Sequence, residues 1–339
     1  MYLENFTNKR SNNLNLLKFF AACAVIISHS YPLSLGKNHV DYLNVISGNS
    51  LGLGGLAVAV FFLSSGYLVS KSIEKRGEKG YIKARILRII PPLILSVIIT
   101  ILISGLFFSK LNFGSFILNI DTLKYCLNML LIPIHNLPGV FEKNIYGSVV
   151  NGALWTLPVE FFCYIILLVF YKLKLLNKKS FRILIPIVLI CYFFTIIAGD
   201  YYAILKLIMT YLQPMFVFFM GCVYYIYRDS IKVSNELFIV NCLLFVLCIY
   251  LKIGNIGTVL FFPYVLLYVS FCIKQCRTSF SELGNISYGM YLCGFPIQQM
   301  VVSFFGGTMN EYLNMIISIP LSMIIGYIIY LLAEKNLKI

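Results

Sequence analysis

Apolar stretches long enough to cross a lipid bilayer recur from one end of this chain to the other. A helix needs about 20 mostly apolar residues to span the hydrocarbon core. Hydrophobic residues make up 60% of the chain, charged residues only 12%, and the mean hydropathy is +0.86. Soluble domains carry about twice that share of charged residues. We therefore predict an all-α polytopic membrane protein, because only helices and closed barrels satisfy their backbone groups in lipid.

The hydropathy pattern predicts about ten transmembrane helices, and the basic residues orient them. If the N-terminus is inside, the inner segments hold most of the lysines and arginines, above all the connections 71–88 and 172–182. Cytoplasmic segments typically show this bias, so we predict that both termini are cytoplasmic. The net charge of +14 is then explained by topology and an anionic inner leaflet rather than by nucleic acid. The predicted spans are residues 14–34, 51–70, 89–108, 154–171, 183–199, 203–227, 236–252, 256–273, 287–305 and 312–332.

Nothing in the sequence predicts a second domain, so residues 1–339 are expected to form a single membrane domain. Residues 1–13 are polar and no small-residue cleavage site follows the first apolar run, which indicates a retained span rather than a signal peptide. Cysteines fall mostly within apolar runs, and the pair Cys272 and Cys276 has no histidine or third cysteine nearby. We therefore expect neither disulfides nor a metal site.

The first predicted span contains two ionisable residues, Lys18 and His29. On a helix, eleven residues amount to three turns plus about 20°, so both side chains share one face and lie about 16 Å apart along it. Ionisable groups at such depth usually face a protein interior or a wet cavity and mark functional sites. The alternative is that each of them only hydrogen-bonds a neighbouring helix.

A third ionisable residue, Glu160, is predicted about 12 Å inside the span 154–171, measured from its outer end. His29 lies in the outer half of its own span, so the depths of the two residues allow contact. A carboxylate that orients and stabilises an imidazolium is what a histidine general base requires. We therefore predict His29 and Glu160 as catalytic residues.

Two arginines, Arg85 and Arg88, lie at the entrance of the third predicted span. The basic connection that contains them has two interpretations: a helix lying on anionic lipid, or an anion site for a phosphate-bearing ligand. These arginines and Lys18 lie toward the cytoplasmic side, whereas His29 and Glu160 lie toward the outside. A coenzyme A thioester has the matching shape, with phosphates at one end and a long thin arm that carries the acyl group. We therefore predict that the three cations bind such a donor.

The longest predicted external connection covers about residues 109–153. Its apolar piece, Leu123 to Pro133, is too short to cross the bilayer and is expected to form a re-entrant or surface helix. The neighbouring sequences NLPG and NIYGSVVNG are typical of turns, and we expect them to lie over a cavity mouth.

Four short motifs follow one another in the first half of the chain. They are Lys18-x10-His29, GGLAVAVFFLSSGYL at 54–68, Arg85-x-x-Arg88-x-x-Pro91 and Leu154-Trp155-Thr156-x-x-x-Glu160. Motifs of other enzyme classes, such as G-x-S-x-G, the Walker loop and H-E-x-x-H, are absent.

In this order the four motifs resemble those of the family-3 integral-membrane acyltransferases, which are Arg-x10-His, GG-x-x-V-x-x-FF-x-x-SG, R-x-x-R-x-x-P and LW-[ST]-L-x-x-E. The resemblance covers residues 14–164, and the later spans match only in number and hydropathy.

This resemblance implies an enzyme that transfers an acyl group, commonly acetyl from cytoplasmic acetyl-CoA, without a metal. The implied acceptor is a hydroxyl of a bacterial surface polysaccharide (capsule, O-antigen or exopolysaccharide) or of its lipid-linked precursor, at the outer side of the cytoplasmic membrane. His29 would be the catalytic base, Lys18, Arg85 and Arg88 would hold the donor, and Glu160 would support the site. The lipid bilayer is then the remaining partner, and nucleic acid is not one.

The sequence departs from the family pattern at two positions. Lys18 replaces the usual arginine, and its ammonium lacks the bidentate fork of a guanidinium. Ala59 stands where many members carry aspartate, so one possible partner of His29 is absent. Glu160 is therefore the more important candidate for that partner.

Two other functions were considered for a protein with many spans. A glycan transporter or flippase also has polar groups around a wet cavity, but transporters often show repeat symmetry between their halves, and none is visible here. A membrane polymerase of glycan repeat units needs a large external loop rich in arginine, and the connection 109–153 contains none.

Overall fold

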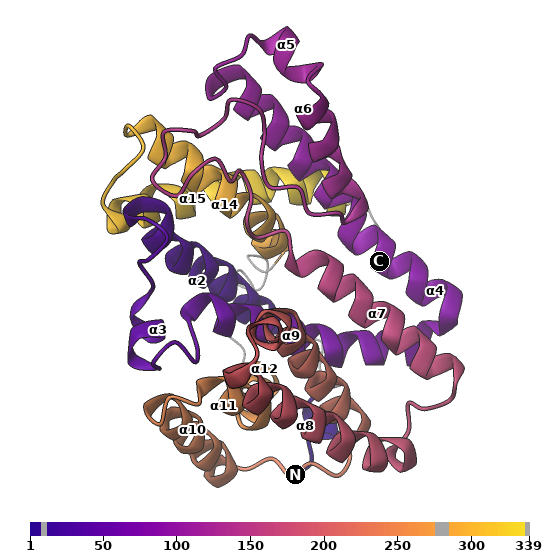
Figure 1. Ribbon diagram of the computed structural model, residues 1–339. Coiled ribbons are helices and arrows are strands. Elements are labelled where there is room, and N and C mark those ends of the chain that lie inside the picture. The colour runs from indigo at the N-terminus through magenta and orange to yellow at the C-terminus, as the bar shows by residue number, and fades with distance from the viewer. Residues whose placement is uncertain (8–11, 275–284, 336–339) are drawn as a thin grey trace.

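A computed structural model describes residues 1–7, 12–274 and 285–335 (Figure 1). Over these ranges the chain is helical and contains no β-strand, which agrees with the predicted all-α class. Cys276, considered above as a metal ligand, lies outside the described residues. The elements are α1 Glu4–Thr7, α2 Leu14–Leu35, α3 Tyr42–Ile46, α4 Leu53–Phe107, α5 Phe113–Ile117, α6 Ile120–Tyr125, the 3-10 helix η1 Cys126–Leu130, α7 Thr156–Lys172, α8 Lys178–Tyr201, α9 Ala203–Ile226, α10 Asn235–Tyr250, α11 Gly254–Leu260, α12 Phe262–Phe271, α14 Ser287–Phe304, α15 Glu311–Ile329 and the π-helix η3 Tyr330–Glu334.

All ten predicted spans coincide with helices. The ranges 51–70 and 89–108 fall on the single long helix α4, and 256–273 falls on the pair α11 and α12. Among the described residues, five helices are long and apolar enough to cross a membrane, and α11 with α12, bent by 50°, would make a sixth. The structure is thus that of a helical membrane protein, while ten spans and cytoplasmic termini stay predictions.

The connection between α4 and α7 contains only short helices. The longest, α6, has six residues, so no helix of this connection can cross a bilayer. Asparagines start two of them: Asn112 accepts a hydrogen bond from the Ser115 amide, and Asn119 accepts one from the Asp121 amide. In Figure 1, α5 and α6 lie at one extreme end of the molecule, beyond the second half of α4.

The long helix α4 consists of two arms, residues 53–76 and 78–107, joined by a bend at Gly77 (Figure 1). Gly77 has φ 66° and ψ −177°, a conformation that is essentially restricted to glycine. In a straight helix Ser65 and Arg85 would lie about 30 Å apart. Both nevertheless line one cavity, so the bend brings the two arms together around it.

We expect Gly77→Ala to destabilise the protein through backbone strain. A Cβ at Gly77 would meet no atom within 4 Å, so the substitution adds about 1–3 kcal/mol of strain without a clash. The melting temperature of the purified protein in detergent should therefore fall by a few degrees. The matched control is Gly114→Ala in α5, where φ is not positive and a Cβ would lie 3.7 Å from Oδ1 of Asn112. Equal melting temperatures for both variants would contradict this interpretation of the bend.

The first arm of α4 packs on α9 with no side chain between the two backbones. A Cβ on Gly66 would come 2.1 Å from a backbone oxygen of α9, and a Cβ on Gly221 would come 2.3 Å from a backbone oxygen of α4. A second close crossing joins α14 and α15, where a Cβ on Gly289 would come 2.8 Å from the Cα of Gly326. Small residues at such crossings let membrane helices gain packing contacts that bulkier residues would prevent.

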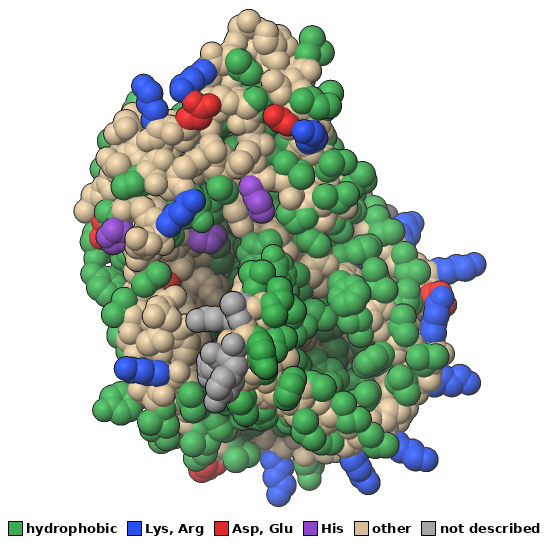
Figure 2. All heavy atoms as spheres, in the orientation of Figure 1, with side chains coloured by type: hydrophobic (Ala, Val, Ile, Leu, Met, Phe, Trp, Pro, Cys, Tyr) green, Lys and Arg blue, Asp and Glu red, His purple; other side chains and the backbone are tan. Residues whose placement is uncertain are grey.

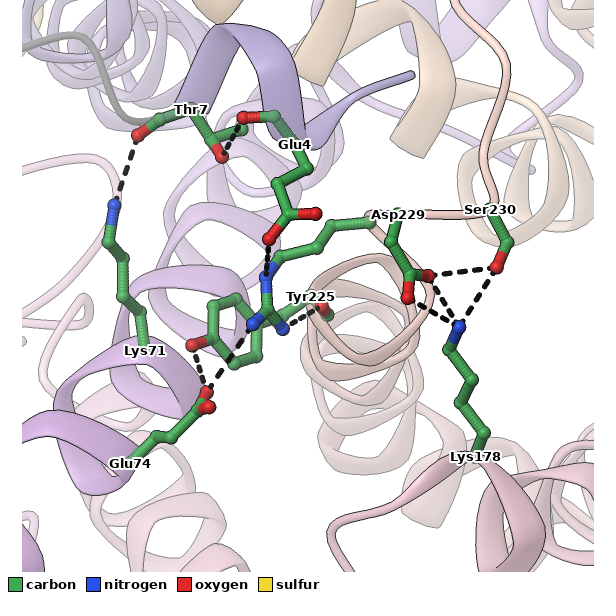
Figure 3. Close-up of polar contacts among 9 residues, drawn as sticks. Glu4, Thr7, Lys71, Glu74, Lys178, Tyr225, Asp229 and Ser230 are labelled. Carbon is green, nitrogen blue, oxygen red and sulfur yellow. Dashed lines mark hydrogen bonds and ion pairs between the residues drawn. The ribbon is translucent and has the colours of Figure 1, made fainter.

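A polar cluster centred on Arg228 joins α1, α4 and α9 (Figure 3). Its guanidinium lies 3.6 Å from a carboxylate oxygen of Glu4 and 3.8 Å from one of Glu74, and Figure 3 shows these two acids approaching it from opposite sides. Lys71 donates a hydrogen bond of 3.0 Å to the backbone oxygen of Thr7. The N-terminal segment is thereby held against the first arm of α4.

A second ion pair lies next to this cluster and connects α8 to the end of α9. Lys178 contacts a carboxylate oxygen of Asp229 at 2.6 Å, and this hydrogen bond lowers the pKa of Asp229 below its ordinary value. The basic bend region of α4, the start of α8 and the end of α9, which were predicted to share one side of the membrane, therefore lie close together.

Candidate active site

Two cavities lie side by side among the helices. The cationic cavity, of about 90 Å³, is lined by α2, both arms of α4, α7 and α14. The histidine cavity, of about 400 Å³, is lined by α2, the region of α3, the first arm of α4, α9 and α11. Figure 2 shows one face of the molecule hollowed near α3 and α9, with histidine side chains around the hollow. Val58, Thr156 and Tyr291 line both cavities and form their shared wall.

The three cations predicted to bind a donor lie together in the cationic cavity. Lys18 comes from α2, and Arg85 and Arg88 come from the second arm of α4. The Nε atom of Arg85 is buried without a hydrogen-bond partner, and its Cζ lies 5.6 Å from the ring centre of Tyr164. Among the described residues that line this cavity only Glu160 is acidic, so their side chains carry an excess of positive charge. Such a cavity favours an anionic ligand.

Arg88 is paired with Glu334, a residue that the sequence analysis did not identify. The π-helix η3 at the end of α15 places the Glu334 side chain in the protein interior, where it is 5% exposed. The Cζ of Arg88 also lies 5.2 Å from the ring centre of Tyr288. The sequence could have indicated a role for Glu334, because it is an acid at the end of the last apolar run, where a charge is costly unless it is paired.

Glu160 lies in the cationic cavity and does not pair with His29. The Ser65 hydroxyl donates a hydrogen bond of 3.0 Å to Oε1 of Glu160, and the Tyr164 hydroxyl donates to the same atom. The Nδ1 atom of His29 has no hydrogen-bond partner. The expected contact between the two predicted catalytic residues is therefore not formed. Depth alone does not decide which face of a helix a residue occupies, and α7 directs Glu160 and Tyr164, one turn apart, toward Ser65.

His29 lines the histidine cavity together with Asp41, the one acid among the described side chains that line it. The imidazole packs edge-on against Phe295, with 5.2 Å between the ring centres. Asp41 is 4% exposed and lies in the connection between α2 and α3. Amides and hydroxyls supply much of the remaining polar lining, which suits a ligand rich in hydrogen-bonding groups. They include Asn44, Asn49, Thr210, Gln213, Asn255 and Thr258.

A hydrogen-bonded pair, Thr156 and Tyr291, forms part of the wall between the cavities. The Tyr291 hydroxyl also donates a hydrogen bond of 3.0 Å to the backbone oxygen of Ala153. Thr156 is the first residue of α7, so the start of this helix reaches the boundary of the two cavities. This pair therefore lies between the cavity that holds the three cations and the cavity that holds His29.

Metal ligands are not clustered in the part of the chain that the structure describes. No group of three or more His, Cys, Asp or Glu side chains there is arranged to hold a metal ion. None of the described cysteines forms a disulfide.

A protein-family model described as an acyltransferase domain matches residues 11–332. The chain belongs to this acyltransferase family. The match includes all the residues that line the two cavities. It confirms the family resemblance found in the motifs, and the protein is an enzyme that transfers acyl groups.

Two curated relatives are similar to this acyltransferase. The first, named O-acetyl transferase, comes from Shigella phage Sf6 and is 29% identical over 335 residues, which are 96% of each chain. The second, named Nodulation protein 10, comes from Rhizobium leguminosarum bv. viciae and is 31% identical over 169 residues, which are 46% of this chain and 43% of the relative. No solved structure matches the chain.

Proposed function

We propose that this acyltransferase moves an acetyl group from acetyl-CoA to a hydroxyl of a bacterial surface polysaccharide or of its lipid-linked precursor. The observation that carries the proposal is the pair of adjoining cavities, one with three cations and one with a histidine and hydrogen-bonding side chains. The name of the Sf6 relative, which aligns over nearly the whole chain, supports O-acetyl transfer.

The cationic cavity supports the donor end of this proposal. Coenzyme A carries phosphates, and guanidinium groups bind phosphate through paired, charge-assisted hydrogen bonds. Arg85 has an unpaired, buried Nε atom, and Arg88 is held by only one acid. Lys18 adds a third positive charge from α2. The narrow cavity suits a thin pantetheine arm, which would carry the thioester past Thr156 and Tyr291 toward His29.

His29 is the proposed general base of the transfer. It would take the proton from an acceptor hydroxyl, whose oxygen then attacks the thioester carbonyl carbon. A new C–O bond forms, the C–S bond breaks, and the sulfur leaves as coenzyme A thiolate. The imidazolium returns its proton to the thiolate, which regenerates neutral His29 and balances the reaction. Glu160, fixed by Ser65 and Tyr164, would act in the donor cavity rather than on His29.

The acceptor would enter the larger histidine cavity. Its amides and hydroxyls match the many hydroxyls of a glycan, and its volume of about 400 Å³ exceeds that of the cationic cavity. We place the enzyme in the bacterial cytoplasmic membrane as a multi-pass protein, with donor and acceptor reaching the two cavities from opposite sides. The apolar helices support this placement.

Label transfer tests the proposed function. Membranes that contain the protein are incubated with acetyl-labelled acetyl-CoA and surface glycan prepared from cells that lack it, and mild base is then used to release esters. We expect base-labile label on the glycan only when the protein is present. Membranes from the same cells without the protein serve as the control.

A glycan transporter would give a different result in this assay. It would move glycan across the membrane whether or not acetyl-CoA is present, and it would leave no ester. Absence of label, together with absence of acetyl-CoA binding to the purified protein, would refute the acetyltransferase and favour the transporter.

A further inference from the structure

The carboxylate of Asp41 connects three elements that surround the histidine cavity. It accepts hydrogen bonds from the Ser28 hydroxyl at 2.6 Å, from the Asn44 amide at 3.0 Å, and from the Leu53 amide at 3.0 and 3.1 Å. Ser28 precedes His29 in α2, Asn44 lies in α3, and Leu53 is the first residue of α4. One buried acid thus fixes these elements relative to one another.

The local backbone is shaped to bring the start of α4 close to this carboxylate. A Cβ on Gly52 would come 3.3 Å from Oδ2 of Asp41 and 3.0 Å from the side-chain nitrogen of Asn44. Glycine at this position therefore lets the Leu53 amide reach both carboxylate oxygens. Backbone amides at the start of a helix lack partners within the helix and favour negative charge. These hydrogen bonds hold the Asp41 carboxylate at a fixed place.

No basic side chain is paired with Asp41 among the residues whose side chains the structure describes. Among those that line the histidine cavity, Asp41 is the only acid and none is a lysine or arginine. His29, whose Nδ1 atom has no hydrogen-bond partner, lines the same cavity. Charges on groups that line a protein cavity interact more strongly than charges in bulk water. A proton that arrives on His29 would therefore be attracted by the charge of Asp41.

We propose that Asp41 is the positioning residue that supplies the counter-charge for protonated His29 during acyl transfer, in place of Glu160. This inference rests on the function proposed above. When His29 takes the proton of the acceptor hydroxyl, the imidazolium forms in the same cavity as an anion that the helix starts already hold in position. Asp41 neither gains nor loses a proton during the reaction, because the proton moves only between the acceptor hydroxyl, His29 and the leaving sulfur.

The variant Asp41→Asn tests the proposal by removing the charge while keeping the size of the side chain. We expect kcat to fall by about tenfold or more. This is a part of the rate enhancement that general base catalysis contributes. The KM for acetyl-CoA should stay unchanged, since Asp41 is not part of the cationic cavity. Rates are expressed per amount of folded protein, measured by size-exclusion chromatography in detergent. The matched control is Asp121→Asn, an exposed acid of α6 that should leave kcat unchanged.

A second variant separates the charge of Asp41 from its role in holding the helices together. Ala59 lines the same cavity, so adding Ala59→Asp to the Asp41→Asn protein returns a carboxylate without restoring the hydrogen bonds to Ser28 and Leu53. We expect this double variant to recover part of kcat. The proposal would be overturned by a folded double variant whose kcat does not recover, or by an Asp41→Asn protein with the wild-type kcat. A wild-type protein without acetyl transfer would instead refute the proposed function.

Discussion

Replacing His29 by alanine should lower the rate of acetyl transfer by about 10²–10⁴-fold, the range that a positioned general base contributes. His29 is the only histidine that lines either cavity, so no other imidazole is in place to take the acceptor proton. The loss should appear in kcat, while KM for acetyl-CoA should change little because the donor cavity is untouched. Label transfer from acetyl-CoA at saturating donor measures the effect.

His39→Ala provides the matched control for His29→Ala. His39 is exposed in the loop after α2, and its Nδ1 atom lies 3.4 Å from the backbone oxygen of Gly36. We expect this variant to transfer acetyl at the wild-type rate. A His29→Ala protein that is present in the membrane in normal amount and as active as His39→Ala would show that His29 is not the base.

Replacing Arg85 by alanine should raise the KM for acetyl-CoA by about 10- to 150-fold, since a hydrogen bond to a charged group contributes about 1.5–3 kcal/mol. The Nε atom of Arg85 is buried without a hydrogen-bond partner, and a donor phosphate would satisfy it. At saturating donor kcat should be preserved, because the interaction is equal in the ground state and the transition state. Initial rates over a range of acetyl-CoA concentrations separate the two constants.

Lys83→Ala is the control for Arg85→Ala, because Lys83 lies on the same arm of α4 but is exposed. Its KM for acetyl-CoA should equal that of the wild type. Equal KM values for the Arg85 and Lys83 variants would show that Arg85 does not bind the donor. The basic connection would then be better interpreted as a helix lying on anionic lipid.

Glu334→Gln should have the opposite effect on donor binding. The Glu334 carboxylate forms an ion pair with the Arg88 guanidinium. A donor phosphate must therefore compete with Glu334 for Arg88. Without this negative charge we expect KM for acetyl-CoA to fall below the wild-type value. The same rate measurements at low donor concentration show the change, and a rise in KM would indicate that Glu334 instead holds Arg88 in its binding position.

The sequence by itself determined the class of the protein, the helices and the family. Hydropathy is a local property, so the ten apolar stretches could be located without knowledge of their packing, and each coincides with a helix. The four motifs that carry the family resemblance are local in the same sense. Lys18, Arg85 and Arg88 were found because charge in or next to an apolar run is costly and therefore informative.

Tertiary structure alone decided which of these residues meet. The bend at Gly77 folds α4 back so that Ser65 and Arg85 line one cavity. A glycine in a basic stretch does not by itself predict such a bend. Glu160 was expected beside His29 from its depth, but the rotation of α7 about its own axis directs it toward Ser65 instead.

The acids near the functional groups, Asp41 and Glu334, were likewise not predicted. Asp41 lies in a connection without helical periodicity, and Glu334 follows the last span, so neither belongs to a pattern that could be read along the chain. Each comes to lie beside the site through long-range packing, and the sequence records the cost of burying a charge but not the identity of the partner that offsets it.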